Sequence, residues 1–326
     1  MPHSENGIIT LTMSSKKEKS QNSFNSNNVR IVKPYPFTHH FNARKADWGL
    51  SLLDMMTLRF PFKSREDWAK RITDGYVKVN DLPVGSDYCL DPAHTISHYN
   101  PNVKEPSVPD EIEIVDETRD YLVLIKPAPM PVHPGGRYYK NTLIEILKAR
   151  GYTDLKIIHR LDAVTSGLLI LGKNPSFTRE AFRCFREGKV KKQYYALVSG
   201  RPIDNETEIS VPIRRKQGFR FECDHSGSSL SKPAFSRFEV RERYKSHSLI
   251  ACFPVTGRTH QLRLHLQHWG YPVFDDPIYG LAPSGRNSLQ KRGIALYNAQ
   301  ISIPELNIDY LLSPPYEWKL LITEEQ

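Results

Sequence analysis

Short strand-forming runs, separated by helical stretches, constrain the fold of this chain more than any other sequence feature. Such apolar, β-favouring runs lie at residues 121–125, 167–171, 195–198 and 249–253. A helix is predicted from Asn141 to Gly151, and another starts at Asn174 with Pro175 at its first position. Because strands and helices are interspersed rather than strictly alternating, we predict an α+β fold with a mixed or mainly antiparallel sheet.

A smaller pattern precedes these strands. The apolar segment Leu50–Phe60 predicts a helix, and Ser64 followed by Asp67 is a capping-box variant that starts a second helix. Gly75 ends this helix. Alternation of apolar and polar residues after it predicts a strand and a turn over residues 76–81. A compact α+β unit of its own is therefore expected here.

The 326 residues exceed the usual size of one domain, so we expect two domains. Residues 1–33 are polar and poor in aromatic residues, and we predict a flexible tail. Residues 101–120 carry seven acids and two bases. The predicted division is a tail at 1–33, a small domain at 34–100, an acidic linker at 101–111 and a large domain at 112–326.

The charge and the cysteines bound the class of protein. The net charge of +9 favours a polyanionic partner. The four cysteines are widely scattered, which argues against a disulfide framework and a zinc ribbon and fits a reducing compartment. No apolar run is long enough for a membrane span, and no secretory signal is expected. We expect a cytoplasmic protein, while the Ser-, Asn- and Lys-rich tail leaves organellar targeting open.

The helix after Asn174 has two unlike faces. Apolar residues at helical spacing form one face: Phe177, Ala181 and Phe185. Basic residues lie opposite: Arg179, Arg183 and Arg186. Residues 179–192 hold six bases and two acids, so this ridge is a candidate phosphate-binding surface. The alternative is an ordinary solvated helix face.

The densest cluster of reactive side chains is the segment His159–Gly167, which leads directly into an apolar strand. Asp162 is placed in a loop at the mouth of a buried strand, where burial raises the pKa of a carboxylate and a nearby arginine keeps it ionised. An ionised carboxylate there can act as nucleophile or base. From the residues alone, a structural Arg–Asp pair, with Thr165 and Ser166 making turn hydrogen bonds, is the stronger interpretation.

Four ordered segments resemble the RluA family of RNA pseudouridine synthases. They are Lys126–Pro134 (KPAPMPVHP), His159–Gly167 (HRLDAVTSG), Val190–Gly200 (VKKQYYALVSG) and Thr256–Leu266 (TGRTHQLRLHL). The resemblance covers about residues 112–303. It implies the family's catalytic fold, a mainly antiparallel sheet with flanking helices and a central cleft. It also implies an isomerase that cleaves the N1–C1′ bond of a uridine in RNA, rotates the uracil and rejoins it through C5.

The resemblance also implies roles for individual residues. Asp162 matches the essential aspartate, and Arg258 the arginine that pairs with it. Tyr194 matches the tyrosine that packs on the uracil and is a candidate base for removing the C5 proton. Arg160 matches a side chain that fills the space left by the flipped nucleotide. Further RNA contacts are predicted for His159, Thr165, Gly167 and Lys192. Asn298 departs from the family pattern, which often has histidine there.

The small N-terminal domain resembles an S4-type RNA-binding module. The resemblance rests on Ser64–Arg65, Trp68, Ile72, Gly75, Val77 and Val79–Asn80. Arg65 and Lys70 are its candidate RNA contacts. The alternative is a small α+β domain whose basic side chains are merely solvated.

The predicted protein is a monomer that acts on tRNA or rRNA and needs neither a cofactor nor a metal. The histidines His260, His265 and His268 lack the i,i+4 spacing typical of helical zinc sites. Two rivals stay open. One is an inactive RNA-binding or RNA-chaperone protein on the same fold, and the other is a glycoside hydrolase, which requires a second carboxylate.

Overall fold

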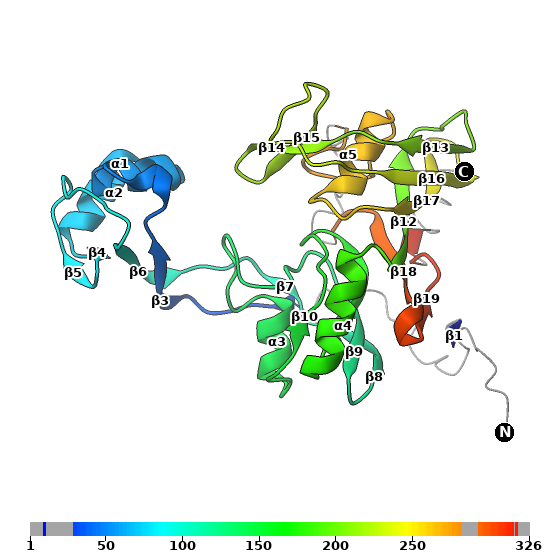
Figure 1. Cartoon of the computed structure of the whole chain (residues 1–326), viewed down its shortest axis with the longest axis horizontal. Helices are drawn as coiled ribbons and strands as arrows, with labels where there is room; N and C mark the ends of the chain where they lie inside the picture. Colours follow the sequence, from blue (N-terminus) through cyan, green and yellow to red (C-terminus); the bar gives the residue numbers. More distant parts are fainter. Residues whose placement is uncertain (1–8, 11–28, 282–292, 316, 319–326) are drawn as a thin grey trace. The chain divides into compact units, whose positions relative to one another are not determined.

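The computed structural model describes residues 9–10, 29–281, 293–315 and 317–318. The chain divides into two compact units, Val32–Glu105 and a larger one formed by Pro106–Gln326 with Met1–Ile31 (Figure 1). Each unit has its own hydrophobic core. Most of the predicted tail at 1–33 lies outside the described residues.

The small unit is a four-stranded sheet packed against two α-helices, with a short 3-10 helix before them. Its strands, in spatial order, are β3 (Tyr35–Asn42), β6 (Thr95–Val103), β4 (Val77–Val79) and β5 (Leu82–Pro83). Its helices are η1 (Lys45–Asp47), α1 (Leu52–Arg59) and α2 (Arg65–Thr73). The core gathers residues from both helices and the sheet, with Trp68 of α2 fully buried among them.

Local sequence signals account for the boundaries in this unit. The capping box is confirmed, because Ser64 Oγ accepts from Asp67 N at 3.1 Å and Asp67 Oδ2 accepts from Ser64 N. Asn80 and Asp81 both have positive φ, at 48° and 62°, as a two-residue hairpin between β4 and β5 requires. The two predicted helices are thus observed, and the strand predicted within residues 76–81 is observed as β4.

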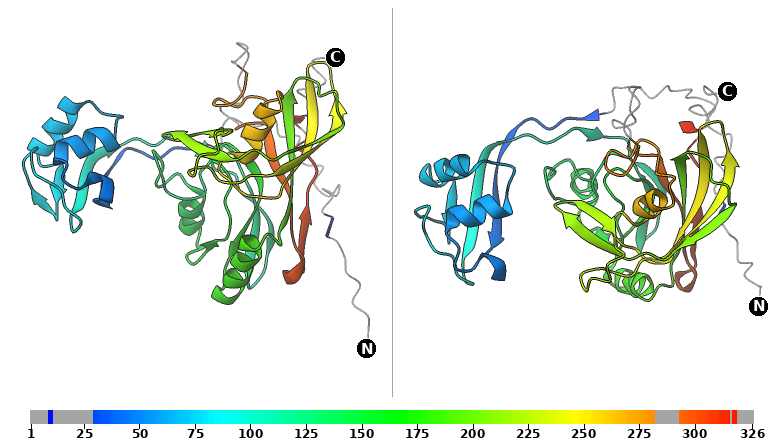
Figure 2. Two further views of the ribbon diagram at one scale, coloured as in Figure 1. Left: turned by 45° about the horizontal axis from the view of Figure 1, so that its top comes forward. Right: turned by 90° about the horizontal axis from the view of Figure 1, so that it is seen from above.

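The large unit is built on an 11-stranded sheet, parts of which run side by side in both views of Figure 2. Its main path is β13 (Glu206–Ile209), β16 (Ser236–Arg243), β17 (His247–Pro254), β12 (Lys191–Ser199), β18 (Leu296–Ile303), β11 (Ser166–Gly172), β9 (Tyr121–Lys126) and β8 (Glu113–Glu117). Off this path lie β19 (Ile308–Leu311), which follows η3 (Pro304–Leu306), β10 (Lys156–Ile157) and β1 (Ile9–Thr10). Only β11–β18 and β1–β19 pair in parallel among the described strands, which confirms the predicted mixed, mainly antiparallel α+β fold.

Strand β11 is buried on both faces, and a different helix covers each face. Leu168 and Ile170 pack with α4 (Pro175–Arg186), whereas Leu169 and Leu171 pack with α3 (Leu143–Ala149). This explains why the strand is continuously apolar. Asn174 caps α4 through its side chain, with Pro175 at the first helical position, as predicted.

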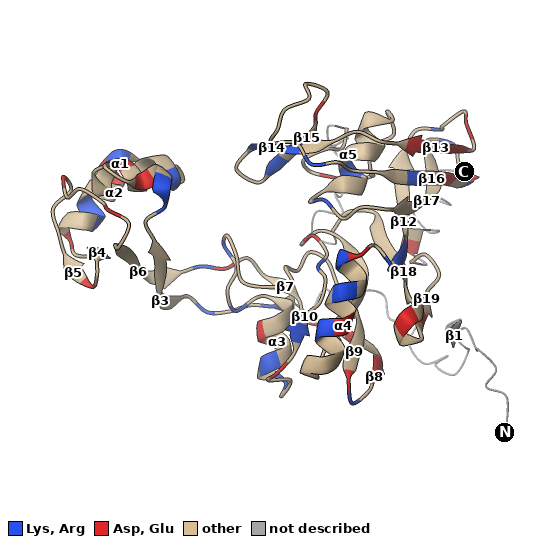
Figure 3. Ribbon diagram, viewed as in Figure 1, with Lys and Arg blue, Asp and Glu red and all other residues tan. Residues whose placement is uncertain are grey.

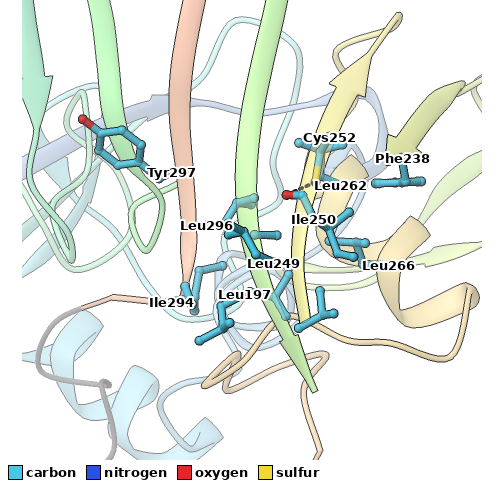
Figure 4. Packing of buried hydrophobic residues seen from close by; sticks show 14 of the residues in the cluster. Leu197, Phe238, Leu249, Ile250, Cys252, Leu262, Leu266, Ile294, Leu296 and Tyr297 are labelled. Carbon is cyan, nitrogen blue, oxygen red and sulfur yellow. Dashed lines mark hydrogen bonds between the residues drawn. The ribbon is translucent and has the colours of Figure 1, made fainter. Parts of the chain in front are cut away.

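The third helix, α5 (Gln261–His268), packs on the other end of the sheet. Figure 4 shows Leu262 and Leu266 of this helix beside Phe238 and Ile250 of the strands. Burying each such side chain contributes about 1.5–3 kcal/mol. These apolar contacts hold helix α5 against the sheet, so the polar side chains on this helix start from a fixed backbone.

Short strands occur in two segments predicted to lack structure. Val29–Arg30 (β2) pairs with Val108–Pro109 (β7), and Ile9–Thr10 pairs with β19. Val108 is buried in the core that contains α3. The acidic segment is thus not a purely solvent-facing linker, because an apolar residue within it docks on the large unit.

Candidate active site

Asp162 lies in the loop between β10 and β11, with its side chain 19% exposed. Its neighbour Leu161 is buried in the core beside α3. The Asp162 carbonyl accepts a hydrogen bond from Thr165 N at 3.1 Å, which closes the turn. A buried neighbour and a closed turn therefore fix the backbone of a carboxylate that can still reach a ligand.

The arginine beside this carboxylate is Arg263 of α5. Its Nη1 lies 3.4 Å from Asp162 Oδ2, and its Nε and Nη2 bind the two oxygens of Asp276 at 2.6 and 2.8 Å. Burial raises the pKa of Asp276, but its hydrogen bonds and ion pair with Arg263 outweigh burial and lower this pKa below the usual range. Arg263 is 2% exposed, so a buried bidentate pair aims its remaining nitrogen at Asp162.

Arg258, which was predicted to pair with the aspartate, does not do so in the described structure. Its Nε donates to the carbonyl of Pro233 at 2.8 Å, and its backbone N donates to Gln261 Oε1. The physical reason is its position before the start of α5. Arg263 lies inside that helix, on the buried face that reaches Asp162.

His260 and Tyr279 extend the network on the other side of Asp162. His260 Nε2 lies 3.9 Å from Asp162 Oδ2, and its Nδ1 lies 2.8 Å from the Tyr279 hydroxyl. Burial lowers the pKa of His260, and the Asp162 charge opposes this shift. The Tyr279 ring also lies under the Arg263 guanidinium, 4.9 Å from its centroid.

Tyr194 lies on β12 at a β-bulge against β18, where its pairing partner shifts to Asn298. It packs against two separate hydrophobic clusters, the one containing α3 and the one containing α5. Burial raises the pKa of Tyr194 above its usual range, and the Asp162 charge adds to this. The phenol therefore keeps its proton at neutral pH.

Lys126 is fully buried behind the aspartate loop. Its Nζ donates to the carbonyls of Pro127 and Met130 at 2.8 Å and to that of Ala163 at 3.3 Å. It thereby ties the end of β9 to the residue after Asp162. Burial lowers the pKa of Lys126 to about 7, against the opposing effect of the Asp162 charge.

This lysine predicts a pH dependence of stability. Between pH 7 and its unfolded pKa of about 10.4, the unfolded chain binds a proton that the folded chain does not, so stability rises with pH. We expect the unfolding free energy of the wild type to rise more steeply from pH 7 to 10 than that of Lys126→Met, measured by urea unfolding. Lys148→Met, at an exposed position of α3, is the control and should follow the wild type. Parallel wild-type and Lys126→Met curves would contradict this assignment.

Three predicted RNA contacts have protein neighbours instead. Thr165 is 3% exposed, and a Cβ on Gly167 would collide with the Asn298 backbone, so this glycine serves strand packing and not substrate approach. His159 stacks on Phe185 at 4.9 Å and accepts from Ile170 N. Burial, together with the Lys192 charge, lowers the pKa of His159 to about 3, so the ring is neutral.

Two other predicted contacts are placed differently. Arg160 is exposed two residues before Asp162, and its charge adds to the effect of burial in lowering the pKa of both His133 and His260. Lys192 is partly buried, and burial lowers the pKa of its amine. Of the two, only Arg160 is openly available to a ligand.

The basic ridge on α4 is less positive than its sequence suggests. Arg183 binds Glu180, Glu187 and Glu305, and the last of these comes from η3, far along the chain. The exposed Arg179 and Arg186 stay available, although Arg186 has a loose contact of 3.9 Å with Glu187. Arg183 is therefore a structural ion-pair centre.

A basic hairpin next to the site was not predicted. Strands β14 (Ile213–Gln217) and β15 (Arg220–Cys223) carry several bases, visible in blue in Figure 3. These are Arg214, Arg215, Lys216 and Arg220. Phe219 at the tip is 74% exposed. The alternation of apolar residues that marks a strand is weak here, although the charge density was a usable signal.

In the small unit, both predicted contacts are exposed on α2. Arg65 pairs with Asp54 at 2.6 Å, and Lys70 has no ion pair among the described residues. Arg71 is turned inward, where its Nε donates to His98 Nε2 and its Nη2 to the carbonyl of Tyr99. Of the two predicted contacts, Arg65 is therefore engaged in an ion pair, and Lys70 has none among the described residues.

The histidines of the α5 segment do not form a shared ligand set. His265 has both ring nitrogens engaged, at 3.0 Å from Ser236 Oγ and 3.0 Å from the Val211 carbonyl.

No described helix has the length and apolar character needed to span a membrane.

The alternative of a glycoside hydrolase requires a second carboxylate that can reach the substrate. Asp276 is the second acid near Asp162, but its side chain has no exposed surface and cannot touch a sugar, which disfavours this alternative.

Comparison with known proteins gives a consistent result. The family model described as RNA pseudouridylate synthase matches residues 120–268. RNA pseudouridine synthase 7 of rice (Oryza sativa subsp. japonica) is 34% identical, over 84% of this chain and 71% of its own length. The tRNA pseudouridine(31) synthase of Saccharomyces cerevisiae is 32% identical, over 78% of this chain and 73% of its own. The solved structure of human RNA pseudouridylate synthase domain containing 1 is 30% identical with a TM-score of 0.54, covering 65% of this chain and 86% of its own.

Proposed function

Since this chain belongs to the family of RNA pseudouridine synthases and is an isomerase that acts on RNA, we propose that Asp162 is its catalytic residue and tRNA its substrate. The observation that carries the catalytic assignment is a partly exposed carboxylate held by a buried Arg263–Asp276 pair. Such a pair places a positive charge beside the carboxylate without blocking access to it.

The reaction breaks the N1–C1′ bond and forms a C5–C1′ bond, so the base leaves and returns to the same ribose. One proton leaves C5 and one is taken up at N1. Asp162 contributes as a nucleophile, at the base or the ribose, or by promoting a glycal. In each case a charged, fixed carboxylate is what the step requires.

Tyr194 is proposed to hold the detached uracil. Its ring is anchored between two hydrophobic clusters, and its raised pKa keeps the hydroxyl protonated. A neutral phenol can stack on the uracil and donate a hydrogen bond, but it is not a ready base. The proton from C5 therefore needs an acceptor other than a pre-formed Tyr194 phenolate.

Arg160 is proposed to stabilise the opened RNA. Extruding a base from its stack costs a few kcal/mol. An exposed guanidinium two residues before Asp162 can stack on the bases that flank the gap. This offsets part of the cost of extrusion.

The substrate class is tested with unmodified tRNA transcripts. The named yeast relative acts at tRNA position 31, so we propose that position first. The purified full chain is incubated with total tRNA transcripts, and pseudouridine is mapped chemically at each nucleotide. Modification at position 31, abolished by a U31→C transcript, is the expected result. Modification of rRNA fragments alone would overturn the tRNA assignment while leaving the isomerase activity intact.

The Val32–Glu105 unit is proposed to be an S4-like RNA-binding module. Its two helices, small sheet and exposed Lys70 support this proposal. Lys63, just before α2, is the second lysine near this helix.

Neutralising both lysines tests the module. We expect Lys63→Gln/Lys70→Gln to weaken RNA binding and to make the plot of log K against log salt shallower by about two, because each phosphate contact adds about 0.9 to the slope. Binding is measured by fluorescence anisotropy between 50 and 300 mM salt. Glu66→Gln on the same helix is the control and should not weaken binding. An unchanged salt slope in the double variant would remove RNA binding from this surface.

A further inference from the structure

Both groups that approach the Asp162 carboxylate meet the same oxygen. Arg263 Nη1 lies 3.4 Å and His260 Nε2 lies 3.9 Å from Oδ2. Among the described residues, Oδ1 has no hydrogen bond or ion pair. The two oxygens of this carboxylate are therefore in different environments, one facing cations and donors and one left for a ligand.

The orientation of His260 is set by its other ring nitrogen. The Tyr279 hydroxyl accepts the N–H of Phe221 at 3.0 Å, so its own proton needs an acceptor. His260 Nδ1 lies 2.8 Å from this hydroxyl and accepts its proton when the ring hydrogen is on Nε2. A neutral imidazole that accepts at Nδ1 carries its hydrogen on Nε2, which turns a donor toward Asp162.

We propose that Tyr279 and His260 are positioning residues that orient Asp162, by holding the histidine in the tautomer whose Nε2–H faces Oδ2 and so reserving Oδ1 for the substrate. The 3.9 Å gap closes to a hydrogen bond when RNA binds, since catalytic hydrogen bonds often tighten in the substrate complex. This inference rests on the proposed role of Asp162 and assigns a task to two residues beside it.

The same chain of contacts reaches the basic hairpin. Phe221, whose N–H binds Tyr279, belongs to β15, and its ring also packs edge-on against His260 at 5.3 Å. Arg215 of β14 lies over that ring. The hairpin therefore contacts both His260 and the Tyr279 hydroxyl beside it.

The charged groups around His260 come from several elements. Burial lowers its pKa; Asp162 and Asp276 oppose this shift, while Arg263 and Arg160 add to it. The histidine is thus predicted to report on the charge of Asp162. Removing that charge by Asp162→Asn should lower the pKa of His260, and NMR titration of the imidazole measures this shift.

The test compares two variants with matched controls. Tyr279→Phe removes only the hydroxyl, and His260→Asn removes the imidazole with a residue that tolerates the left-handed backbone at this position (φ 59°). His268→Asn, exposed on α5, and Tyr244→Phe, whose hydroxyl binds Glu242, are the controls. Single-turnover rates on a tRNA that the wild type modifies, the Kd for that tRNA, and ¹⁵N spectra of the histidine rings are measured.

The expected result is a single-turnover rate about 10- to 100-fold lower in both variants, a Kd within about 2-fold of the wild type, and unchanged controls. The wild-type spectrum should show His260 protonated at Nε2 and not at Nδ1. A wild-type Nδ1–H tautomer, or full rates in both variants, would overturn the inference. The inference would also be overturned if the rate of each variant fell only as much as its RNA affinity or its fraction of folded protein. A wild type inactive on every RNA would refute the proposed function instead, and the tautomer would still be readable.

Discussion

Replacing Asp162 with asparagine is expected to lower the rate of pseudouridine formation by at least about 10³-fold, because the neutral amide is neither a nucleophile nor a base. Arg263 keeps its two bonds to Asp276, so the buried pair stays intact in this variant. The affinity for RNA should therefore stay close to that of the wild type. Single-turnover mapping of pseudouridine and a parallel binding assay measure the two quantities.

The control for this variant is Asp154→Asn, at an exposed position in the loop before β10. It removes one exposed carboxylate beyond the other end of β11 and should leave the rate unchanged. A normal yield of pseudouridine from Asp162→Asn would exclude Asp162 as the catalytic residue. Loss of RNA binding together with the rate would instead assign it to substrate binding.

Asp276→Asn is expected to lower the free energy of unfolding by about 3–5 kcal/mol, since it leaves the buried Arg263 without its full counter-charge. It should also lower the rate, because Arg263 is then free to turn fully onto Asp162. Equilibrium urea unfolding measures the first effect. Asp204→Asn, exposed between β12 and β13, is the control and should stay within about 0.5 kcal/mol of the wild type.

The stabilisation that Asp276 contributes depends on pH with a definite sign. The pKa of Asp276 is lower in the folded chain than in the unfolded chain, so its stabilisation is fully present above the unfolded pKa of about 3.9. It is lost as pH falls toward the folded pKa. The gap in stability between wild type and Asp276→Asn should thus narrow below about pH 4. A gap that stays constant down to pH 3 would contradict an ionised Asp276.

The strands and helices near the site were largely predictable from the sequence, because each has an unambiguous signal. Strand β11 is continuously apolar, and α4 starts with an asparagine cap followed by proline. The charged hairpin β14–β15 lacks such a pattern. Its strands are stabilised by pairing with each other and by contacts with α5, which no local signal encodes.

The identity of the arginine beside Asp162 could not be predicted from spacing. Arg258 and Arg263 stand five residues apart in one segment, and the start of α5 between them decides their directions. His260, in a left-handed conformation just before the helix, turns the chain at this point. Arg263 then lies among apolar neighbours, where a sequence pattern indicates a core position rather than a charged one. Its partner Asp276 is thirteen residues away, so only the tertiary fold shows the pair.

Gly167 influences the distance between the Asp162 loop and Tyr194. Its φ of 114° and the absence of a Cβ let β11 lie directly against the backbone of Asn298 on β18. Asn298 is also the strand partner of Tyr194 on β12. The spacing between the Asp162 loop and Tyr194 therefore depends on residue 167 having no side chain larger than a hydrogen atom. An added methyl group there would act as a spacer, separating the acid from the aromatic ring while leaving every catalytic side chain present.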